Sequence, residues 1–509
     1  MYTYLKTRIL QLSWQEWCVI VCVLIGGFLR LYNLENALFQ GDQGRDALIV
    51  SRIFREKDLV FIGPVTSIGN MYLGPLYYYF MLPFLFFSFP SPIGPVYAVA
   101  LLSTLLIFCV YYFGKQLVGS TAALFAAILM TFSSTIIDFS RYSWNPNVAP
   151  FAGFFLLYTT FKAMKQPKYW IWAAVSAAVL LQLHYVTLIA CAVAGLFWVW
   201  AALQSLKKNH KKQFLMATGG ALLVLLISIV PLMLFDAKHG WLNLQAASKI
   251  LTSSENFGYA SSFEKYTQSL ADVDNKVKLL LSDLIFKNKD VFVWNFTLMT
   301  TLVSLLLFLL KKKKEKYGKG LAFLLVNIGI TSVGLALYKH SIFDHYVLFM
   351  LPAAFLFLGW SLAQLWKTQL WGKLWVCVYV GYCVSAQMQH YSFGPAGPTF
   401  QQLSITAQAI QKEVEFQEPY ALVLLSESHD VLGMNYRYFL SVDADKQPLE
   451  PGDQTQPEKL VIINEEKKTT APQEVPITEI TAFPSKYPKT ILNIPNGSDV
   501  YIFEKSDSK

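Results

Sequence analysis

Long apolar segments separated by short polar connections dominate the first four-fifths of the chain. Runs of about 18 or more apolar residues recur there, and a helix of that length crosses a hydrocarbon core of about 30 Å. The pattern therefore predicts a polytopic, all-α membrane protein with about eleven transmembrane helices plus juxtamembrane helices. The expected spans are 15–33, 93–113, 119–137, 148–164, 169–184, 186–204, 213–234, 291–310, 321–338, 346–365 and 374–389.

Composition agrees with this interpretation. Of the 509 residues, 54% are hydrophobic and only 15% are charged, whereas about a quarter of the residues of a soluble domain are charged. These values exclude a soluble enzyme, a DNA-binding protein and a disordered chain. The net charge of +9 comes from lysines between the spans, where they set topology. The six cysteines all lie inside apolar spans and suggest neither zinc nor a redox pair.

Lysine clusters orient the chain, because positive charge in short loops marks the cytoplasmic side. The segment 72–89 is apolar enough to cross but contains Pro75 and Pro83, and its placement decides the topology. If it stays at the interface, all three clusters face the cytoplasm and the C-terminus lies outside. The clusters are Lys162/Lys165/Lys168, Lys207/Lys208/Lys211/Lys212, and Lys311–Lys314 with Lys316 and Lys319.

The last part of the chain changes character. We expect a transmembrane catalytic domain over 1–390, with a first outer loop at about 35–92 and a long outer loop at about 235–290. Residues 391–509 form a small C-terminal extracytoplasmic α/β domain after a Gly-Pro linker. Its predicted elements are an amphipathic helix at 400–415 and strands at 421–425, 460–463 and 500–503.

The first outer loop carries the strongest candidate chemistry. Asp42, Arg45 and Asp46 fall on one face of a predicted helix that continues through Arg55. An acid beside a cation at the membrane surface can take a proton while the cation holds an anionic lipid headgroup. The competing interpretation makes Asp42 a helix N-cap and leaves Arg45 and Asp46 solvated. The nearby Arg52, Arg55 and Lys57 lie on the outer face, against the charge rule, and an anionic partner would compensate for them.

An ordered set of short motifs resembles the GT-C glycosyltransferases, and especially the group of protein O-mannosyltransferases and aminoarabinose transferases. The resemblance covers about residues 10–390. The sequence departs from the family at Gln43, where many members carry Glu. Only Asp42 therefore matches the catalytic position. The motifs are Gly41–Ala47, Leu76–Tyr79, Ser140–Asn147, Phe235–Gly240, and His345-Tyr346 before Pro352-Ala353.

The resemblance implies an inverting glycosyltransferase that moves a sugar from a polyprenyl-phosphate donor to a protein, lipid or glycan on the extracytoplasmic face. Asp42 would be the base. Arg45 would stabilise the leaving phosphate, with Arg141, Lys57 and Lys238 as alternates. The resemblance implies neither a cofactor nor a dependence on a metal ion. The partners would be the donor, membrane lipid and the acceptor, with no nucleic acid.

Other residues are candidates for substrate binding, each with a structural alternative. Arg141 binds phosphate or extends to water, and Asn145 and Asn147 bind sugar hydroxyls or form a turn. Polar residues near the end of a span, such as His184, are often functional. The remaining candidates are Asp46, Tyr78, Tyr185, His239, His345 and Tyr346.

A transport function is the main alternative, namely a polyprenol-linked-sugar flippase or another secondary carrier. Carriers usually place charged residues and broken helices near the bilayer midplane, often in repeated halves. In this sequence, charges in the middle of the spans are nearly absent and no halves repeat. A membrane scaffold is a third possibility, but it leaves the first loop unexplained. Asp443–Asp445 is interpreted as a surface turn. We expect a multi-pass protein of a bacterial cytoplasmic membrane.

Overall fold

The computed structural model describes most of the chain. The described ranges are 12–66, 71–206, 211–252, 267, 271–287, 291–310, 316–338, 342–395, 397–414, 418–427, 430–442, 447–466, 472–485, 487–495 and 498–505. Asp443–Asp445 and Lys311–Lys314, which the sequence analysis singled out, lie outside these ranges.

Each expected span coincides with a helix. In the described ranges, seven helices are long and apolar enough to cross a membrane, so the predicted polytopic fold is confirmed. The helices that match the expected spans are α2 (Trp14–Leu31), α5 (Ile93–Val118), α6 (Ser120–Phe132), α8 (Ala149–Ala163), α9 (Tyr169–Leu183), α10 (Leu188–Leu206), α11 (Lys211–Lys238), α16 (Val291–Leu309), α17 (Gly318–Leu337), α18 (Leu351–Trp366) and α19 (Leu370–Met388).

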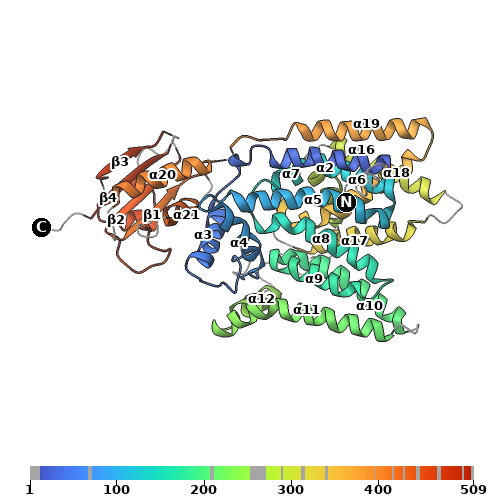
Figure 1. Ribbon diagram of the computed structural model, residues 1–509, viewed down its shortest axis with the longest axis horizontal. Helices are drawn as coiled ribbons and strands as arrows, with labels where there is room; N and C mark the ends of the chain where they lie inside the picture. The colour runs from blue at the N-terminus through green and yellow to red at the C-terminus, as the bar shows by residue number, and fades with distance from the viewer. Residues whose placement is uncertain are drawn as a thin grey trace, which may run out of the picture.

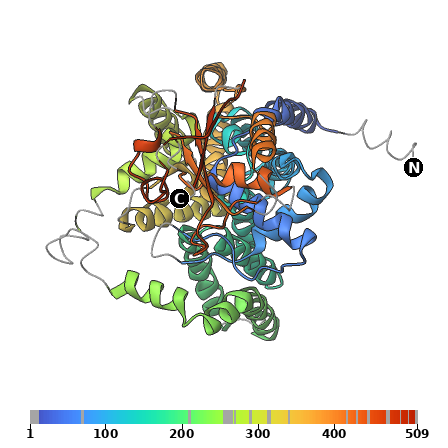
Figure 2. The same cartoon turned by 90° about the vertical axis from the view of Figure 1, so that its left-hand side faces the viewer.

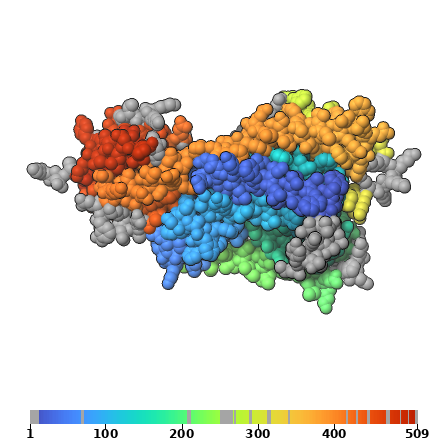
Figure 3. Space-filling view, turned by 45° about the horizontal axis from the view of Figure 1, so that its top comes forward, coloured from blue at the N-terminus to red at the C-terminus, as the bar shows by residue number. Residues whose placement is uncertain are grey.

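These helices form a bundle whose centre is α18. Its apolar segment is entirely buried, with α5, α6, α8, α16, α17 and α19 packed around it. Figure 1 shows α19 along one edge of the bundle and α11 along the opposite edge. In the space-filling view α2 runs along the surface beside α5 (Figure 3). The many exposed apolar side chains of α2 and α11 are typical of lipid-facing helices.

Shorter helices connect the bundle elements. One of them, α4, has 13 residues and is about 20 Å long, which is less than the hydrocarbon thickness of about 30 Å. The short helices are η1 (Leu34–Asn36), α3 (Gly41–Arg55), α4 (Leu76–Ser88), α7 (Ser134–Phe139), η2 (Asn145–Val148), η3 (Tyr185–Thr187), α12 (Leu242–Thr252), α14 (Val273–Lys278), η5 (Leu279–Asp283), α15 (Leu284–Phe286), η6 (Asp344–Tyr346) and η7 (Leu348–Met350).

The C-terminal segment folds as a small α/β unit at one end of the bundle (Figures 1 and 2). Its sheet has the order β1-β2-β4-β3, with β1 parallel to β2 and the other pairs antiparallel. The expected helix and three expected strands are confirmed. The elements are α20 (Phe400–Glu413), β1 (Tyr420–Leu425), α21 (Met434–Val442), β2 (Lys459–Asn464), η9 (Pro472–Glu474), α22 (Thr478–Thr481), β3 (Thr490–Asn493) and β4 (Asp499–Glu504).

Both faces of the central strands are covered. Leu422 and Leu424 of β1 belong to the main core with residues of α20 and α21, whereas Val423 and Leu425 pack in a second cluster with Ile480 and Phe483. Alternate residues of a strand point to opposite faces, which explains this division. The near-continuous burial of β1 and β2 follows from it.

The strand β3 and the helix α21 are among the elements of this unit that were not predicted. The strand β3 is at the sheet edge and alternates between half-buried and exposed residues, so it lacks the apolar run that marked the other strands. The helix α21 has only 9 residues and mixes polar with aromatic side chains. The burial of α21 depends on its packing against α3, a helix that lies far earlier in the sequence.

Candidate functional site

The candidate site is built on α3, which begins at Gly41. The backbone N–H of Gln40 donates to Oε1 of Gln43 at 3.1 Å, so Gln40 caps the helix. The alternative in which Asp42 is the N-cap is therefore wrong. Gln43, which stands where a second carboxylate was expected, has a structural role in the first turn.

Arg45 joins two carboxylates of α3. Its Nη1 donates to Oδ1 of Asp42 at 2.8 Å, and its Nη2 and Nε donate to Oδ1 of Asp46 at 2.8 and 3.0 Å. The Tyr78 hydroxyl of α4 donates to the same Asp46 oxygen at 3.3 Å. The side chain of Asp42 is 45% exposed, that of Arg45 25% and that of Asp46 0%. Exposure thus increases from Asp46 through Arg45 to Asp42, and the alternative of a solvated Asp46 is also wrong.

Burial sets the protonation behaviour of this group. It raises the pKa of the Asp46 carboxyl to about 6, although the Arg45 guanidinium opposes the shift. Burial acts to lower the pKa of Arg45, but the carboxylates of Asp46 and Asp42 outweigh it and raise that pKa. Arg45 therefore stays charged. Among the described residues, Oδ2 of Asp46 has no hydrogen-bond partner, which agrees with a carboxyl close to its protonation point.

Asp42 and Arg45 open into a cavity of about 790 Å³ between α3 and the C-terminal unit. This volume is within the range of small-molecule binding sites. Among the described residues, no three His, Cys, Asp or Glu side chains are arranged to hold a metal ion. The cavity is lined by Leu38, Gln40, Gly41, Asp42, Gln43, Arg45, Leu48, Ile49, Arg52, Tyr142, Trp144, Asp430, Leu432, Met434, Glu450 and Pro451.

The opposite wall belongs to the start of α21, which contacts α3 directly. A Cβ on Gly44 would lie 2.4 Å from the backbone nitrogen of Asn435, and one on Gly41 would lie 2.7 Å from Oδ2 of Asp430. Only glycine allows the two helices to approach this closely. The Gly-x-x-Gly spacing around Asp42 is thus a docking surface for α21.

Sequence reasoning missed the residues of this wall. Asp430 accepts a hydrogen bond from the backbone N–H of Met434 at 3.0 Å, and burial raises the pKa of its carboxyl. Asp430 lies four positions before the start of α21 and thus outside the N-cap position that a sequence pattern would reveal. Neither this contact nor the placement of α21 against α3 could therefore be predicted.

The basic residues after Arg45 are largely used within the protein. Arg52 forms an ion pair with Glu450 across the cavity. Arg55 donates to the backbone oxygens of Ser441 and Val442, at 2.8 and 3.2 Å, where α21 ends. Lys57 is exposed beyond α3 and does not line the cavity. Arg52 therefore has an anionic partner within the protein, so its charge does not depend on the external anion expected from the sequence.

Arg141 caps the end of α2. Its Nη1 donates to the Tyr32 oxygen at 2.6 Å, and weaker hydrogen bonds reach the oxygens of Leu29, Arg30 and Asn33. A cation near a helix C-terminus is favourable. With only 7% of its surface exposed, Arg141 is committed to the protein backbone and does not line the cavity.

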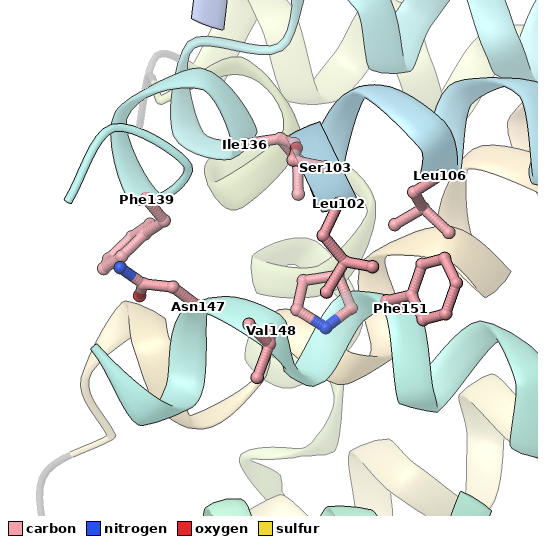
Figure 4. A pocket seen from close by; sticks show the side chains of 9 residues that line it. Leu102, Ser103, Leu106, Ile136, Phe139, Asn147, Val148 and Phe151 are labelled. Atoms are coloured by element: carbon pink, nitrogen blue, oxygen red, sulfur yellow. The ribbon is translucent and has the colours of Figure 1, made fainter. Parts of the chain in front are cut away.

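The asparagines of the Asn-Pro-Asn motif also make backbone contacts. Nδ2 of Asn145 donates to the Leu183 oxygen at 2.5 Å, and Nδ2 of Asn147 donates to the Tyr142 oxygen at 3.0 Å. Asn147 borders a separate cavity of only about 10 Å³, beside Leu102, Ile136 and Phe151 of neighbouring helices (Figure 4). This space holds about one water molecule. The geometry agrees with the turn alternative for both residues.

His184 and His345 meet in an aromatic cluster behind the cavity wall. Their ring centroids lie 5.9 Å apart, and His345 lies 4.4 Å from Trp144, which lines the cavity. Tyr346 packs 4.5 Å from His184. Burial lowers the pKa of His345 to about 4, so this imidazole is neutral at pH 7. The structure thus brings together residues 144, 184 and 345, which lie far apart in the sequence.

Residues of the 235–290 segment do not reach the cavity in the described part of the chain. The Tyr185 hydroxyl donates to the Tyr72 oxygen at 2.5 Å. Asp236 accepts hydrogen bonds from the backbone of Asn243 at 3.0 Å, at the start of α12. Lys238 and His239 are exposed at the end of α11. The backbone N–H of Tyr72 donates to Oδ1 of Asn243 at 2.7 Å, which holds α12 against the segment before α4.

Comparisons with known proteins agree with this architecture. The family model described as dolichyl-phosphate-mannose-protein mannosyltransferase matches residues 74–234. The structure is similar to that of ArnT from Cupriavidus metallidurans bound to undecaprenyl phosphate, with a TM-score of 0.53 and 12% identity over 96% of this chain and 98% of that chain. The chain has a GT-C fold. The predicted resemblance to GT-C glycosyltransferases is thereby confirmed.

A second GT-C similarity is more distant. The archaeal oligosaccharyltransferase AglB from Archaeoglobus fulgidus, solved with an inhibitory peptide and a dolichol-phosphate, has a TM-score of 0.48 and 13% identity, over 86% of this chain and 64% of that chain. No curated protein matches the chain significantly by sequence.

Proposed function

We propose that the protein is an inverting glycosyltransferase that uses a polyprenyl-phosphate-linked sugar as donor. The observation that carries this proposal is the cavity of about 790 Å³ in which a half-exposed carboxylate, Asp42, lies beside a guanidinium, Arg45. The GT-C fold and the undecaprenyl phosphate bound to ArnT support the donor class. By the lysine clusters, the cavity faces the extracytoplasmic side of a bacterial membrane.

The reaction follows from these two groups. Asp42 takes the proton of an acceptor hydroxyl while that oxygen attacks the anomeric carbon of the sugar. The bond from the anomeric carbon to the phosphate oxygen breaks, and polyprenyl phosphate leaves with the electron pair. A single displacement inverts the anomeric centre. One base and one cation are sufficient for this step.

Arg45 keeps donors for the leaving phosphate. A guanidinium has five N–H groups, and three of them are used on Asp42 and Asp46. The remaining two can bind the phosphate oxygens, whose charge grows as the bond breaks. Arg52, which also lines the cavity, is the second candidate. Asp46 and Tyr78 act behind Arg45 and hold its orientation.

The direct test is Asp42→Asn in purified protein supplied with labelled polyprenyl-phosphate sugars and membrane-derived acceptors. We expect the release of free polyprenyl phosphate to fall by about 10³-fold, since general-base groups contribute about 10²–10⁴-fold. Asp58→Asn is the matched control, because Asp58 is an exposed aspartate just after α3 that does not line the cavity. Full activity in Asp42→Asn would refute the proposed base.

The same assay separates the proposal from transport. A flippase moves the labelled lipid between leaflets of a vesicle without releasing free polyprenyl phosphate. Movement without release, equal in the wild type and Asp42→Asn, would favour the transporter.

A further inference from the structure

A second cavity lies in the bundle, away from the candidate site. It is a groove of about 420 Å³ between α8 and α9. Aromatic residues of both helices form half of its lining, and Thr159 and Ser176 add aliphatic hydroxyl groups. The lining residues are Phe151, Ala152, Phe155, Tyr158, Thr159, Tyr169, Trp172, Val175, Ser176 and Val179.

The groove ends at a basic turn. The helices α8 and α9 are consecutive, and residues 164–168 connect them. The start of α8 follows Tyr142 and Trp144 of the candidate site, so this turn is about 22 Å away along a helix of 15 residues. Figure 1 shows the two helices side by side in the bundle. The basic turn is therefore at the end remote from the C-terminal unit.

Lysines converge on the mouth of the groove. The Nζ atoms of Lys162 and Lys168 lie 5.6 and 5.8 Å from the ring centroid of Tyr169, which lines the groove. The Lys162 ammonium also donates to Oε1 of Gln116 at 3.1 Å, and the Tyr158 hydroxyl donates to the same oxygen at 3.4 Å. Two ammonium groups and two phenols thus gather at one end of an apolar channel.

The charges at this end are not neutralised by the protein. In the described ranges, none of the ion pairs involves Lys162, Lys165 or Lys168. Lysines near a membrane surface attract anionic lipid headgroups. An apolar groove that ends in unneutralised cations is complementary to a molecule with an anionic head and a hydrocarbon chain.

We propose that the groove is a binding site for one anionic phospholipid of the membrane. The phosphate lies between Lys162 and Lys168 beside the Tyr169 ring, and an acyl chain lies along Phe155 and Trp172. Long lysine side chains can extend their ammonium groups from the basic turn to the level of the lipid phosphates. This site is independent of the proposed sugar transfer.

Native mass spectrometry of the full-length protein in neutral detergent tests the proposal. The probes are dioleoyl phosphatidylglycerol and dioleoyl phosphatidylcholine, which differ in headgroup charge but not in chains. We expect the wild type to bind phosphatidylglycerol at least about tenfold more tightly. In the variant K162Q/K165Q/K168Q this preference should disappear.

A charge-matched control removes three lysines elsewhere. The variant K316Q/K367Q/K373Q loses the same charge but leaves the groove intact, because these residues do not line it. It should keep the tenfold preference. Equal binding of both lipids by the wild type, or equal loss in both triple variants, would overturn the site.

A second variant tests the groove itself. Val175 lines it, so V175F places a ring where the acyl chain would lie while all lysines remain. We expect lipid binding to weaken by about tenfold in V175F, with unchanged elution on size exclusion. Unchanged phosphatidylglycerol binding in V175F would mean that the lysines alone attract the lipid, and the groove would not be its site.

Discussion

The contact between α3 and α21 makes a quantitative prediction at Gly44. A Cβ there would lie 2.4 Å from the Asn435 nitrogen and 2.5 Å from the carbonyl carbon of Met434. Both atoms belong to the backbone, so no side chain can rotate away. Ordinary contact begins at 3.4 Å, and the difference, 3.4 − 2.4 = 1.0 Å, is the separation that Gly44→Ala forces between the helices.

This separation should affect both stability and activity. Overpacking of a tight contact costs about 1–3 kcal/mol, and a misplacement of about 1 Å near reacting groups costs about 10²-fold in rate. We expect Gly44→Ala to lower kcat/KM for polyprenyl phosphate release by about 10²-fold. Its melting temperature in detergent should fall only modestly, because the bundle core is untouched.

Gly329→Ala is the matched control. Gly329 lies within α17, and nothing is within 4 Å of its added Cβ. The control should keep full activity, and its stability should be equal or slightly higher, because alanine favours helix. If Gly44→Ala had the activity and melting temperature of the control, the docking of α21 on α3 would be wrong.

Two further predictions concern charged groups around the site. The pKa of Asp46 is raised to about 6 from about 3.9 in an unfolded chain, so the folded protein binds the extra proton and the free energy of unfolding should decrease as pH rises from 4 to 6. Above pH 6 the ionised Asp46 orients Arg45, so activity should fall as pH drops through 6. Asp46→Asn should abolish the pH dependence of the free energy of unfolding and that of the activity. Melting and rate assays that show the same pH dependence in this variant as in the wild type would contradict the role of Asp46. Arg141→Leu removes a charged cap from α2 and should lower the free energy of unfolding by about 3 kcal/mol, seen as a lower melting temperature. Its KM for the donor should not change, and a raised KM with unchanged stability would instead restore Arg141 as a phosphate ligand.

Much of the architecture followed from local patterns. Apolar runs of membrane length predicted the spans that became α2 to α19, because backbone groups in lipid must pair within a helix. The helical periodicity after Asp42 predicted α3, and the apolar runs at 421–425 and 460–463 predicted β1 and β2. Asp42 and Arg45 were also predicted to be neighbours, since their separation is a property of one helix.

The surroundings of that pair depended on the tertiary structure. Whether Asp46 is solvated or buried is decided by Tyr78 and α4. The opposite wall of the cavity comes from Asp430 and Glu450, about 400 residues after Asp42 in the chain. Similarly, Arg52 and Arg55 resembled an anion site, yet their partners lie in the C-terminal unit. Spacing along the chain specifies which side chains share a helix face, but burial and pairing arise only when distant segments pack together.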